Sequence, residues 1–270
     1  RPPRSTLSSS SAASDVYKRQ VQAIKTALDA TRRQAGLVRK EITLPNGLCY
    51  AYLEGGQGEP LLLLHGFGGN KDTFTRVARF LVKRYRLIIP DIIGFGESSH
   101  PNADYSPFTQ VERIRDLSRA LNLERLHLGG NSMGGQIALL YAALYPTEVA
   151  SLWLLSPAVS GNSVNPELLK VISESGRNPL IARNVQEFME VMALGMRKPP
   201  FIPGPMLKVL AQERIQNAEL EARIFRQIVE APVEDKITGL KTPALIMFGK
   251  QDRVITLETT NDLGLSLIHI

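Results

Sequence analysis

The chain has 270 residues, of which 43% are hydrophobic, enough for one large domain with an apolar core. Cys49 is its only cysteine, which excludes a disulfide within the chain, and no Cys/His spacing typical of a zinc site occurs. The formal net charge of +6 is partly due to four basic residues in the first twenty positions, so it indicates no nucleic-acid partner.

The two ends of the chain differ in character from the rest. Residues 265–270 can be encoded by a DNA segment whose reverse complement encodes residues 15–20, and this string resembles a translated sequencing-library adapter. We therefore expect residues 1–20 and 265–270 to be non-native and residues 21–264, with a net charge of +3, to be the natural segment. No apolar run is long enough for a membrane span, which favours a cytoplasmic or membrane-associated location, although a signal or anchor upstream of Val21 stays open.

Strand and helix patterns alternate along the natural segment. The expected strands are Glu41–Leu44, Leu48–Leu53, Leu61–Leu64, Arg86–Asp91, Arg125–Leu128, Ser151–Leu155 and Ala244–Phe248. The expected helices are Val21–Leu37, Phe74–Lys83, Phe108–Leu121 and Gln136–Leu144. Pro45-Asn46-Gly47 predicts a hairpin between the first two strands. Because strands and helices alternate, we predict an α/β fold with a mainly parallel sheet and helices on both faces.

The alternation stops between Ser160 and Leu240, where several helical patterns and no clear strand occur. This predicts a helical cap at 160–240, inserted between two parts of the core at 21–159 and 241–264. The charged residues of Gln212–Arg226 are expected to form a solvated helix face.

Three methionines of the cap, Met189, Met192 and Met196, recur at helical spacing. Methionine fills irregular apolar space and tolerates varied ligands. Two interpretations stay open: the three side chains pack the core of a helical subdomain, or they contact the acyl chain of a substrate.

Gly130-Asn131-Ser132-Met133-Gly134 matches the pattern G-x-S-x-G. An expected strand precedes the match and an expected helix follows it, which is the context of a nucleophile elbow rather than an ordinary glycine-rich turn. The turn is tight and needs small flanking residues, which the glycines supply. The sequence therefore predicts Ser132 as a nucleophile.

His65-Gly66-Phe67-Gly68-Gly69 follows the strand Leu61–Leu64. Acyl transfer needs two donors aimed at the developing oxyanion. The expected sources are the amide after the nucleophile and an amide in the loop after this earlier strand, so we predict the N–H groups of Met133 and Phe67. His65 is expected to have a structural role.

Gly249-Lys250-Gln251-Asp252 follows the expected strand Ala244–Phe248. A carboxylate placed after the serine in chain order, just beyond such a strand, orients the catalytic histidine of a triad. We therefore predict Asp252 as the acid. Asp91 also ends a strand, but it precedes the serine and is expected to be structural.

Together these motifs resemble the α/β-hydrolase family over essentially all of residues 21–264, and most closely its bacterial lipases, esterases and monoacylglycerol-lipase-like members. The resemblance implies a serine hydrolase that cleaves carboxylic esters through an acyl-enzyme, without metal or organic cofactor. It also implies that Ser132 is the nucleophile, Asp252 the acid, and Phe67 and Met133 the oxyanion donors. The implied partner is a small ester or lipid, with possible membrane-surface contact, and the oligomeric state is not readable.

The catalytic histidine is where the chain departs from the family pattern. The family places it in a loop one strand beyond the acid, whereas the only histidine after Asp252 is His269, within the adapter-like tail. We therefore expect the family's last strand, last helix and catalytic histidine to be absent, and a protein of residues 21–264 to be nearly inactive. The edge of Ala244–Phe248 is expected to be uncovered and prone to aggregation.

Two other functions remain open. The elbow Asn131-Ser132-Met133 also resembles that of hydrolases that cleave carbon–carbon bonds in ring-cleavage products, although the apolar, methionine-rich cap favours esters. A non-catalytic, ligand-binding member of the fold is the second alternative, and it would not need an intact elbow, acid and oxyanion loop.

Overall fold

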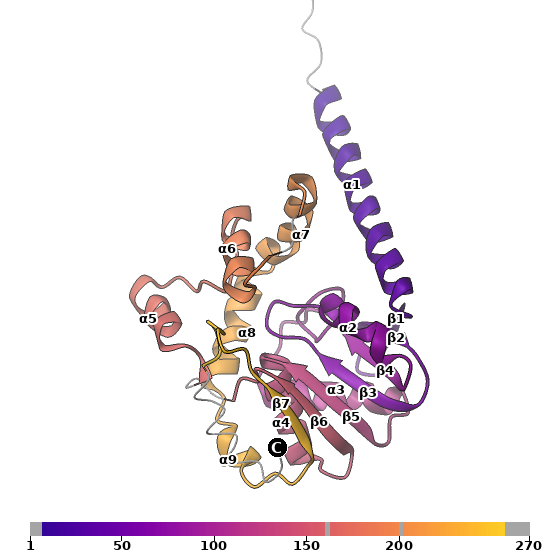
Figure 1. The fold of residues 1–270 in the computed structure, drawn as a ribbon. Helices are drawn as coiled ribbons and strands as arrows, with labels where there is room; N and C mark the ends of the chain where they lie inside the picture. Colours follow the sequence, from indigo (N-terminus) through magenta and orange to yellow (C-terminus); the bar gives the residue numbers. More distant parts are fainter. Residues whose placement is uncertain (1–6, 160–162, 200–201, 257–270) are drawn as a thin grey trace, which may run out of the picture.

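The computed structural model describes residues 7–159, 163–199 and 202–256, and a sheet runs through the middle of this part (Figure 1). Its strands are β1 (Val38–Thr43), β2 (Cys49–Gly55), β3 (Glu59–Leu64), β4 (Tyr85–Pro90), β5 (Leu126–Asn131), β6 (Val149–Leu155) and β7 (Ala244–Met247). They lie in the order β1-β2-β4-β3-β5-β6-β7. Every predicted strand is present, with ends shifted by at most a few residues.

The sheet is mainly parallel, as predicted. β4, β3, β5, β6 and β7 pair in parallel, whereas β1 and β2 form an antiparallel hairpin and β2 also pairs antiparallel with β4. In the hairpin turn, Gly47 has φ 83° and the Leu44 N–H donates to Leu48 O at 2.8 Å. Glycine adopts this left-handed backbone without a steric penalty, which explains its place in the turn.

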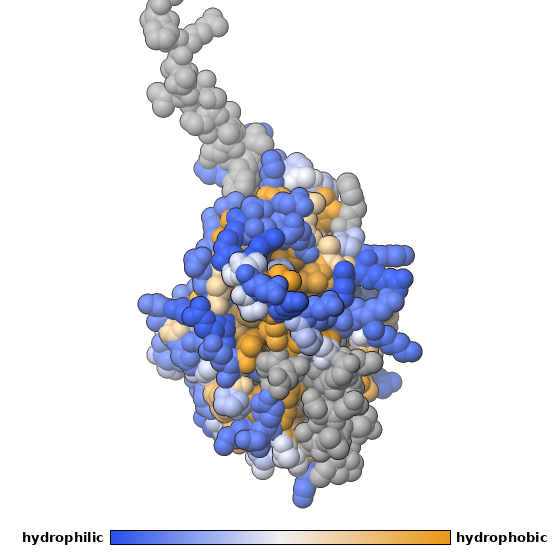
Figure 2. Space-filling model, turned by 90° about the vertical axis from the view of Figure 1, so that its left-hand side faces the viewer, coloured by the Kyte–Doolittle hydropathy of each residue, from blue (hydrophilic) through white to orange (hydrophobic). Residues whose placement is uncertain are grey.

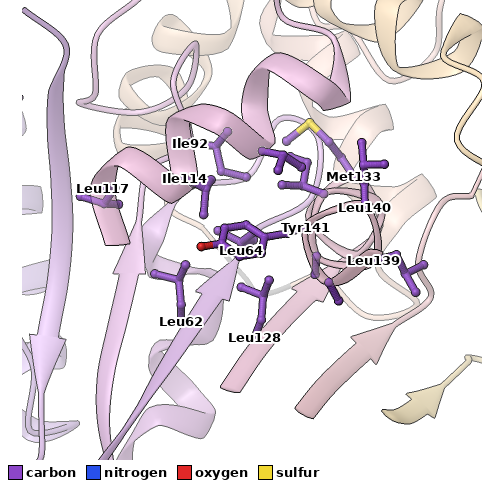
Figure 3. Packing of buried hydrophobic residues seen from close by; sticks show 14 of the residues in the cluster. Leu62, Leu64, Ile92, Ile114, Leu117, Leu128, Met133, Leu139, Leu140 and Tyr141 are labelled. Carbon is purple, nitrogen blue, oxygen red and sulfur yellow. The ribbon is translucent and has the colours of Figure 1, made fainter. Parts of the chain in front are cut away.

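Helices cover both faces of the sheet. They are α2 (Thr75–Leu81), α3 (Pro107–Ala120) and α4 (Met133–Leu144), with a 3₁₀ turn, η1, at Lys71–Phe74. A further helix, α1 (Leu7–Gln34), contacts β1 and α2. The four leucines of β3 alternate between the faces: Leu61 and Leu63 pack towards α2, and Leu62 and Leu64 towards α3 and α4. Figure 3 shows Leu62, Leu64 and Leu128 from the strands meeting residues of α3 and α4, such as Ile114, Leu139 and Tyr141.

The exposed fraction of the four β3 leucines is 5% or less. A fully buried leucine stabilises the fold by about 1.5–3 kcal/mol relative to an exposed one. The unbroken apolar run is thus explained by a strand that faces helices on both sides.

Between β6 and β7 the described residues form five helices and no extended strand. Isolated bridge positions occur at Val164, which pairs with Ile255, and at Leu240. These cap helices are α5 (Pro166–Ser175), α6 (Val185–Gly195), α7 (Gly204–Gln216), α8 (Ala218–Glu230) and α9 (Glu234–Ile237). In Figure 1, α5–α8 lie together on one side of the strands. The helical character predicted for this insertion is confirmed.

The prediction of a solvated charged face over Gln212–Arg226 is wrong for Arg214 and Glu221. Their side chains are 13% and 2% exposed and pair with each other. Sequence periodicity treats both as surface charges, but a buried charge is tolerated when an opposite charge and hydrogen bonds satisfy it.

Helix α1 includes the predicted Val21–Leu37 segment up to Gln34 and projects away from the sheet in Figure 1. Near its end, the buried Arg32 donates two hydrogen bonds to Asp72 of η1, at 2.8 and 2.6 Å. No helix of the described residues is both long and apolar enough to span a membrane. In the described sheet, β7 lies at the edge opposite β1, and its residues Leu245 and Met247 are 58% and 50% exposed.

Candidate active site

Ser132 lies between β5 and α4 with φ 52° and ψ −116°. A non-glycine residue in this region stores backbone strain of about 1–3 kcal/mol, and such strain persists only where the surroundings enforce it. The flanking glycines allow the turn: a Cβ at Gly130 would lie 2.1 Å from Gly134 O, and one at Gly134 would lie 2.2 Å from Leu64 O. The predicted elbow geometry is therefore present.

Neighbouring backbone holds the strained residue in place. The Ser132 N–H donates to Leu155 O at 3.0 Å, and the Ala158 N–H donates to Ser132 O at 3.1 Å. Both partners belong to β6 or the segment that follows it. Ser132 is thus fixed from the neighbouring parallel strand as well as by its own strand and helix.

Two amides beside Ser132 have no acceptor within the described residues. Met133 is the first residue of α4, so its N–H has no intrahelical partner, and the Phe67 N–H donates to no described group either. The loop that carries Phe67 passes close to the serine, because a Cβ on Gly66 would lie 3.3 Å from Ser132 Cβ. Both amides predicted as oxyanion donors therefore lack an acceptor in the part of the chain that the structure describes, and their residues flank the serine.

His65, at the start of this loop, is fully buried and both of its ring nitrogens have partners. Nε2 accepts the Ile92 N–H at 3.0 Å and Nδ1 lies 2.8 Å from Gly66 O, a pattern that assigns the proton to Nδ1. Burial lowers the pKa of His65 and keeps the ring neutral. The ring therefore ties the loop that carries Phe67 to the residues that follow β4.

Asp91 secures the other end of the loop. This fully buried carboxylate accepts the Lys71 N–H at 2.6 Å, the Lys71 ammonium at 2.7 Å and the Glu97 N–H at 2.8 Å. Lys71 also pairs with Glu97 at 3.0 Å. With all of these bonds Asp91 is committed to the loop, which matches its predicted structural role.

Ser132 and Asp252 line the same cavity, of about 1210 Å³. The remaining lining residues come from three places. They are Gly66, Phe67, Asn131 and Ser156 of the core, Leu180, Val191, Leu194, Gly195 and Arg197 of the cap, and Gly249, Lys250, Gln251, Arg253, Val254 and Ile255 of the loop after β7. Oδ1 of Asp252 accepts the Val254 and Ile255 N–H groups at 2.9 and 3.0 Å. These bonds leave Oδ2 without a partner among the described residues and available to a base.

The three cap methionines lie outside the lining of the cavity. Met189 and Met196 are 43% and 42% exposed, α6 has no buried residue, and none of the three methionines lines the cavity. Val191 and Leu194, on another face of α6, line it instead. Their i, i+3 spacing is the only sequence signal for this face. Substrate contact by Met189, Met192 and Met196 stays a prediction.

None of the three histidines in the described residues lines the cavity. His65 is engaged as above, His127 lies in β5 with its ring nitrogens 2.8 Å from Ser151 Oγ and 3.0 Å from a Glu59 oxygen, and His100 lies in the segment after β4. His269 lies outside the described residues. Within those residues no group of three His, Cys, Asp or Glu side chains is placed to hold a metal ion.

Arg197, Lys250 and Arg253 give the cavity a cationic wall, and Asp252 is its only acidic lining residue among those described. Arg197 Nη1 donates to Gln251 Oε1 at 2.8 Å, and Arg253 donates to Ala193 O. These bonds join α6 and the segment directly after it to the loop after β7. In Figure 2, which views the cap side, hydrophobic residues gather near the middle of the face and hydrophilic ones border them.

The strained serine, the two amides without a described acceptor and the shared cavity with Asp252 are the arrangement of one large hydrolase family, and a sequence profile described as "alpha/beta hydrolase fold" matches residues 59–264. The chain belongs to the α/β-hydrolase fold family.

Individual members of the family are similar over most of the chain. Lipase 1 of Psychrobacter immobilis is 45% identical, over 85% of this chain and 74% of its own. Monoacylglycerol lipase abhd6-B of Xenopus laevis is 32% identical, over 87% of this chain and 74% of its own. The crystal structure of a membrane phospholipase A, described as a bacterial virulence factor, is 35% identical with a TM-score of 0.88, covering 97% of this chain and 86% of that one.

Proposed function

We propose that this α/β hydrolase is a serine esterase of the lipase type, with Ser132 as its nucleophile. One observation carries the proposal: at the wall of a 1210 Å³ cavity lies a serine in a strained backbone conformation, φ 52° and ψ −116°, beside two amides that have no acceptor among the described residues. Ligand binding alone requires none of this strain, whereas an exposed nucleophile does. The lipase relatives support an ester as the substrate.

In the proposed reaction, Ser132 Oγ attacks the carbonyl carbon of the ester while a base removes its proton. The N–H groups of Phe67 and Met133 bind the negative oxygen of the tetrahedral intermediate. The bond to the alcohol oxygen then breaks, and the protonated base returns its proton to the leaving alcohol. Water, activated by the same base, attacks the acyl-enzyme and releases the carboxylic acid, which restores the Ser132 hydroxyl.

Asp252 is proposed to orient the base through Oδ2 and to stabilise its protonated form. The base itself is the histidine that the family resemblance places after Asp252, and we propose that it lies outside the described residues. Residues 21–264 contain no histidine after Asp252. A protein of those residues alone is expected to be slower by up to about a millionfold, the effect of losing the base in a serine protease.

The cavity suits an acyl chain on its cap side, where Leu180, Val191 and Leu194 supply apolar surface. The cationic wall of Arg197, Lys250 and Arg253 is the observation that favours a second candidate. Hydrolases of ring-cleavage products act on dienoic keto acids, whose carboxylate such a wall would attract. Both candidates use the same serine, so only substrates separate them.

The test uses the full-length product of the source gene, with any coding sequence that follows codon 264. A fluorophosphonate should label Ser132, identified by peptide mass spectrometry, and the Ser132→Ala variant should not be labelled. Hydrolysis of monoacylglycerols and p-nitrophenyl esters, lost in Ser132→Ala, supports the proposal. Labelling with turnover of a dienoic keto acid but of no ester would select the second candidate. Absence of both labelling and turnover would favour a ligand-binding protein.

A further inference from the structure

The oxyanion loop, residues 66–70, contains Gly66, Gly68 and Gly69. Glycine has the greatest backbone freedom of any residue, so a loop rich in it keeps one shape only if other groups restrain it. The core restrains both ends, through His65 and Lys71 as described above. The middle of the loop, which carries the Phe67 amide, has two weaker restraints: the Gly69 N–H donates to Gly66 O at 3.0 Å, and the Phe67 ring meets that of Phe95 with centroids 5.8 Å apart.

The cap adds a further restraint on the middle of the loop. Arg214 of α7 donates from Nη1 to Gly68 O at 3.0 Å, and from Nη2 to Leu180 O at 2.8 Å and to Glu221 Oε2 at 2.9 Å. Its Nε donates to Glu221 Oε1. One guanidinium therefore joins the oxyanion loop to two other parts of the cap, and its planar fork can serve these partners simultaneously.

The Arg214 guanidinium packs directly against the backbone of Gly68. Gly68 has φ +66°, and a Cβ on it would lie 2.3 Å from Arg214 Cζ. The neighbouring Phe67 ring meets Phe225 of α8 edge to face, with ring centroids 5.5 Å apart. The cap thus holds both the Phe67 side chain and the Gly68 carbonyl.

Burying the Arg214–Glu221 ion pair removes both charges from water, which costs free energy that an apolar contact within the cap would not cost. Glu221 is 2% exposed, and burial raises its pKa against the opposing effect of Arg214. Apolar residues of similar volume often stabilise a fold as well as a buried ion pair does. They cannot donate a directed hydrogen bond to Gly68 O, and that bond is what the ion pair adds.

We propose that Arg214, fixed by Glu221, is a positioning residue that sets the Phe67 amide for oxyanion binding. Arg214 does not line the cavity, so it acts through Gly68 and not on the substrate. The proposal rests on the proposed esterase function.

The test compares variants of the full-length gene product. The double variant Arg214→Met/Glu221→Leu removes the hydrogen bond to Gly68 O without leaving a buried charge unpaired. Arg214→Lys keeps Glu221 paired, but its three N–H donors on one nitrogen cannot serve the four acceptor atoms that the guanidinium serves. It replaces the double variant if that one does not fold. The control is Arg115→Met, which breaks the pair of Arg115 with Glu148, 2.6 Å apart and remote from the cavity.

Loss of one oxyanion donor lowers kcat by about 100- to 1000-fold, and a donor moved out of place costs less. We expect kcat to fall about 10- to 100-fold in the double variant and by a smaller factor in Arg214→Lys, with KM within about twofold of wild type. Affinity for a trifluoromethyl ketone, which forms a bound oxyanion, should fall by the same factor as kcat. Arg115→Met should lose thermal stability but keep kcat.

A kcat of the double variant within about twofold of wild type would overturn the proposal. So would a fall in kcat that Arg115→Met shares at equal loss of stability. If the wild-type gene product hydrolyses no ester and is not labelled by a fluorophosphonate, the proposed esterase function is refuted, and the restraint on the loop is then tested without an activity assay. Amide hydrogen exchange at Gly69, whose N–H donates to Gly66 O at 3.0 Å across the turn, then decides about the loop. Faster exchange of this amide in the double variant than in Arg115→Met supports the restraint, and equal exchange refutes it.

Discussion

Replacing Ser132 by glycine is expected to leave a more stable protein than replacing it by alanine. Both changes remove the hydroxyl, so they differ only in what the backbone costs at φ 52° and ψ −116°. Alanine keeps a strain of about 1–3 kcal/mol, which glycine relieves. Glycine also gives the unfolded chain more conformational freedom than alanine, which lowers the stability of the glycine variant by about 0.4–1 kcal/mol. The net difference should be on the order of 1–2 kcal/mol in favour of glycine.

Thermal unfolding of the two variants measures this difference without any need for catalysis. We expect the melting temperature of Ser132→Gly to exceed that of Ser132→Ala by about 2–8 °C. Ser173 provides the control, because it is exposed in regular α5 helix. There, Ser173→Gly should be less stable than Ser173→Ala by up to about 1 kcal/mol. Equal stability of the two Ser132 variants, or the order found at Ser173, would show that the fold does not hold this residue under strain.

Two further predictions concern the packing and titration of the same region. Gly134→Ala places a Cβ 2.2 Å from the backbone oxygen of Leu64, so we expect the free energy of unfolding in urea to fall by roughly 1–3 kcal/mol or more. Gly195→Ala, with open space around it, is the control and should be neutral or slightly stabilising. Equal effects of the two substitutions would contradict the packing around Gly134. His65 has a pKa lowered by burial, so its contribution to stability is full above the unfolded pKa of about 6.5 and is lost as the pH falls from there towards the folded pKa. The free energy of unfolding of the wild type should therefore fall, relative to His65→Gln, by up to about 1.4 kcal/mol per pH unit within that window, and a constant difference between pH 8 and pH 5 would refute it.

Local pattern was enough to predict the elements that build the site. The apolar run Leu61–Leu64 and the context of Gly130–Gly134 depend on nearest neighbours in the chain, because a doubly covered strand and a tight turn impose composition locally. The order of serine and acid along the chain likewise pointed to Asp252, which the fold brings to the same cavity as Ser132. Helical spacing also predicted the character of the cap.

The cap shows where such patterns fail. Helical spacing drew attention to the methionines, but which face of α6 meets the cavity depends on how the helix is docked, and docking turned Val191 and Leu194 inwards. Arg214 and Glu221 have the sequence signature of surface charges and are nevertheless buried.

The sequence by itself determined the α/β alternation, the elbow with Ser132 and the loop with Phe67, because each is specified by residues close together in the chain. Only the tertiary structure decided that Arg214, 146 positions after Gly68, hydrogen-bonds the oxyanion loop. No local pattern encodes that contact. It exists because α7 packs over the loop, and the low exposure of the pair makes each charge depend on the other.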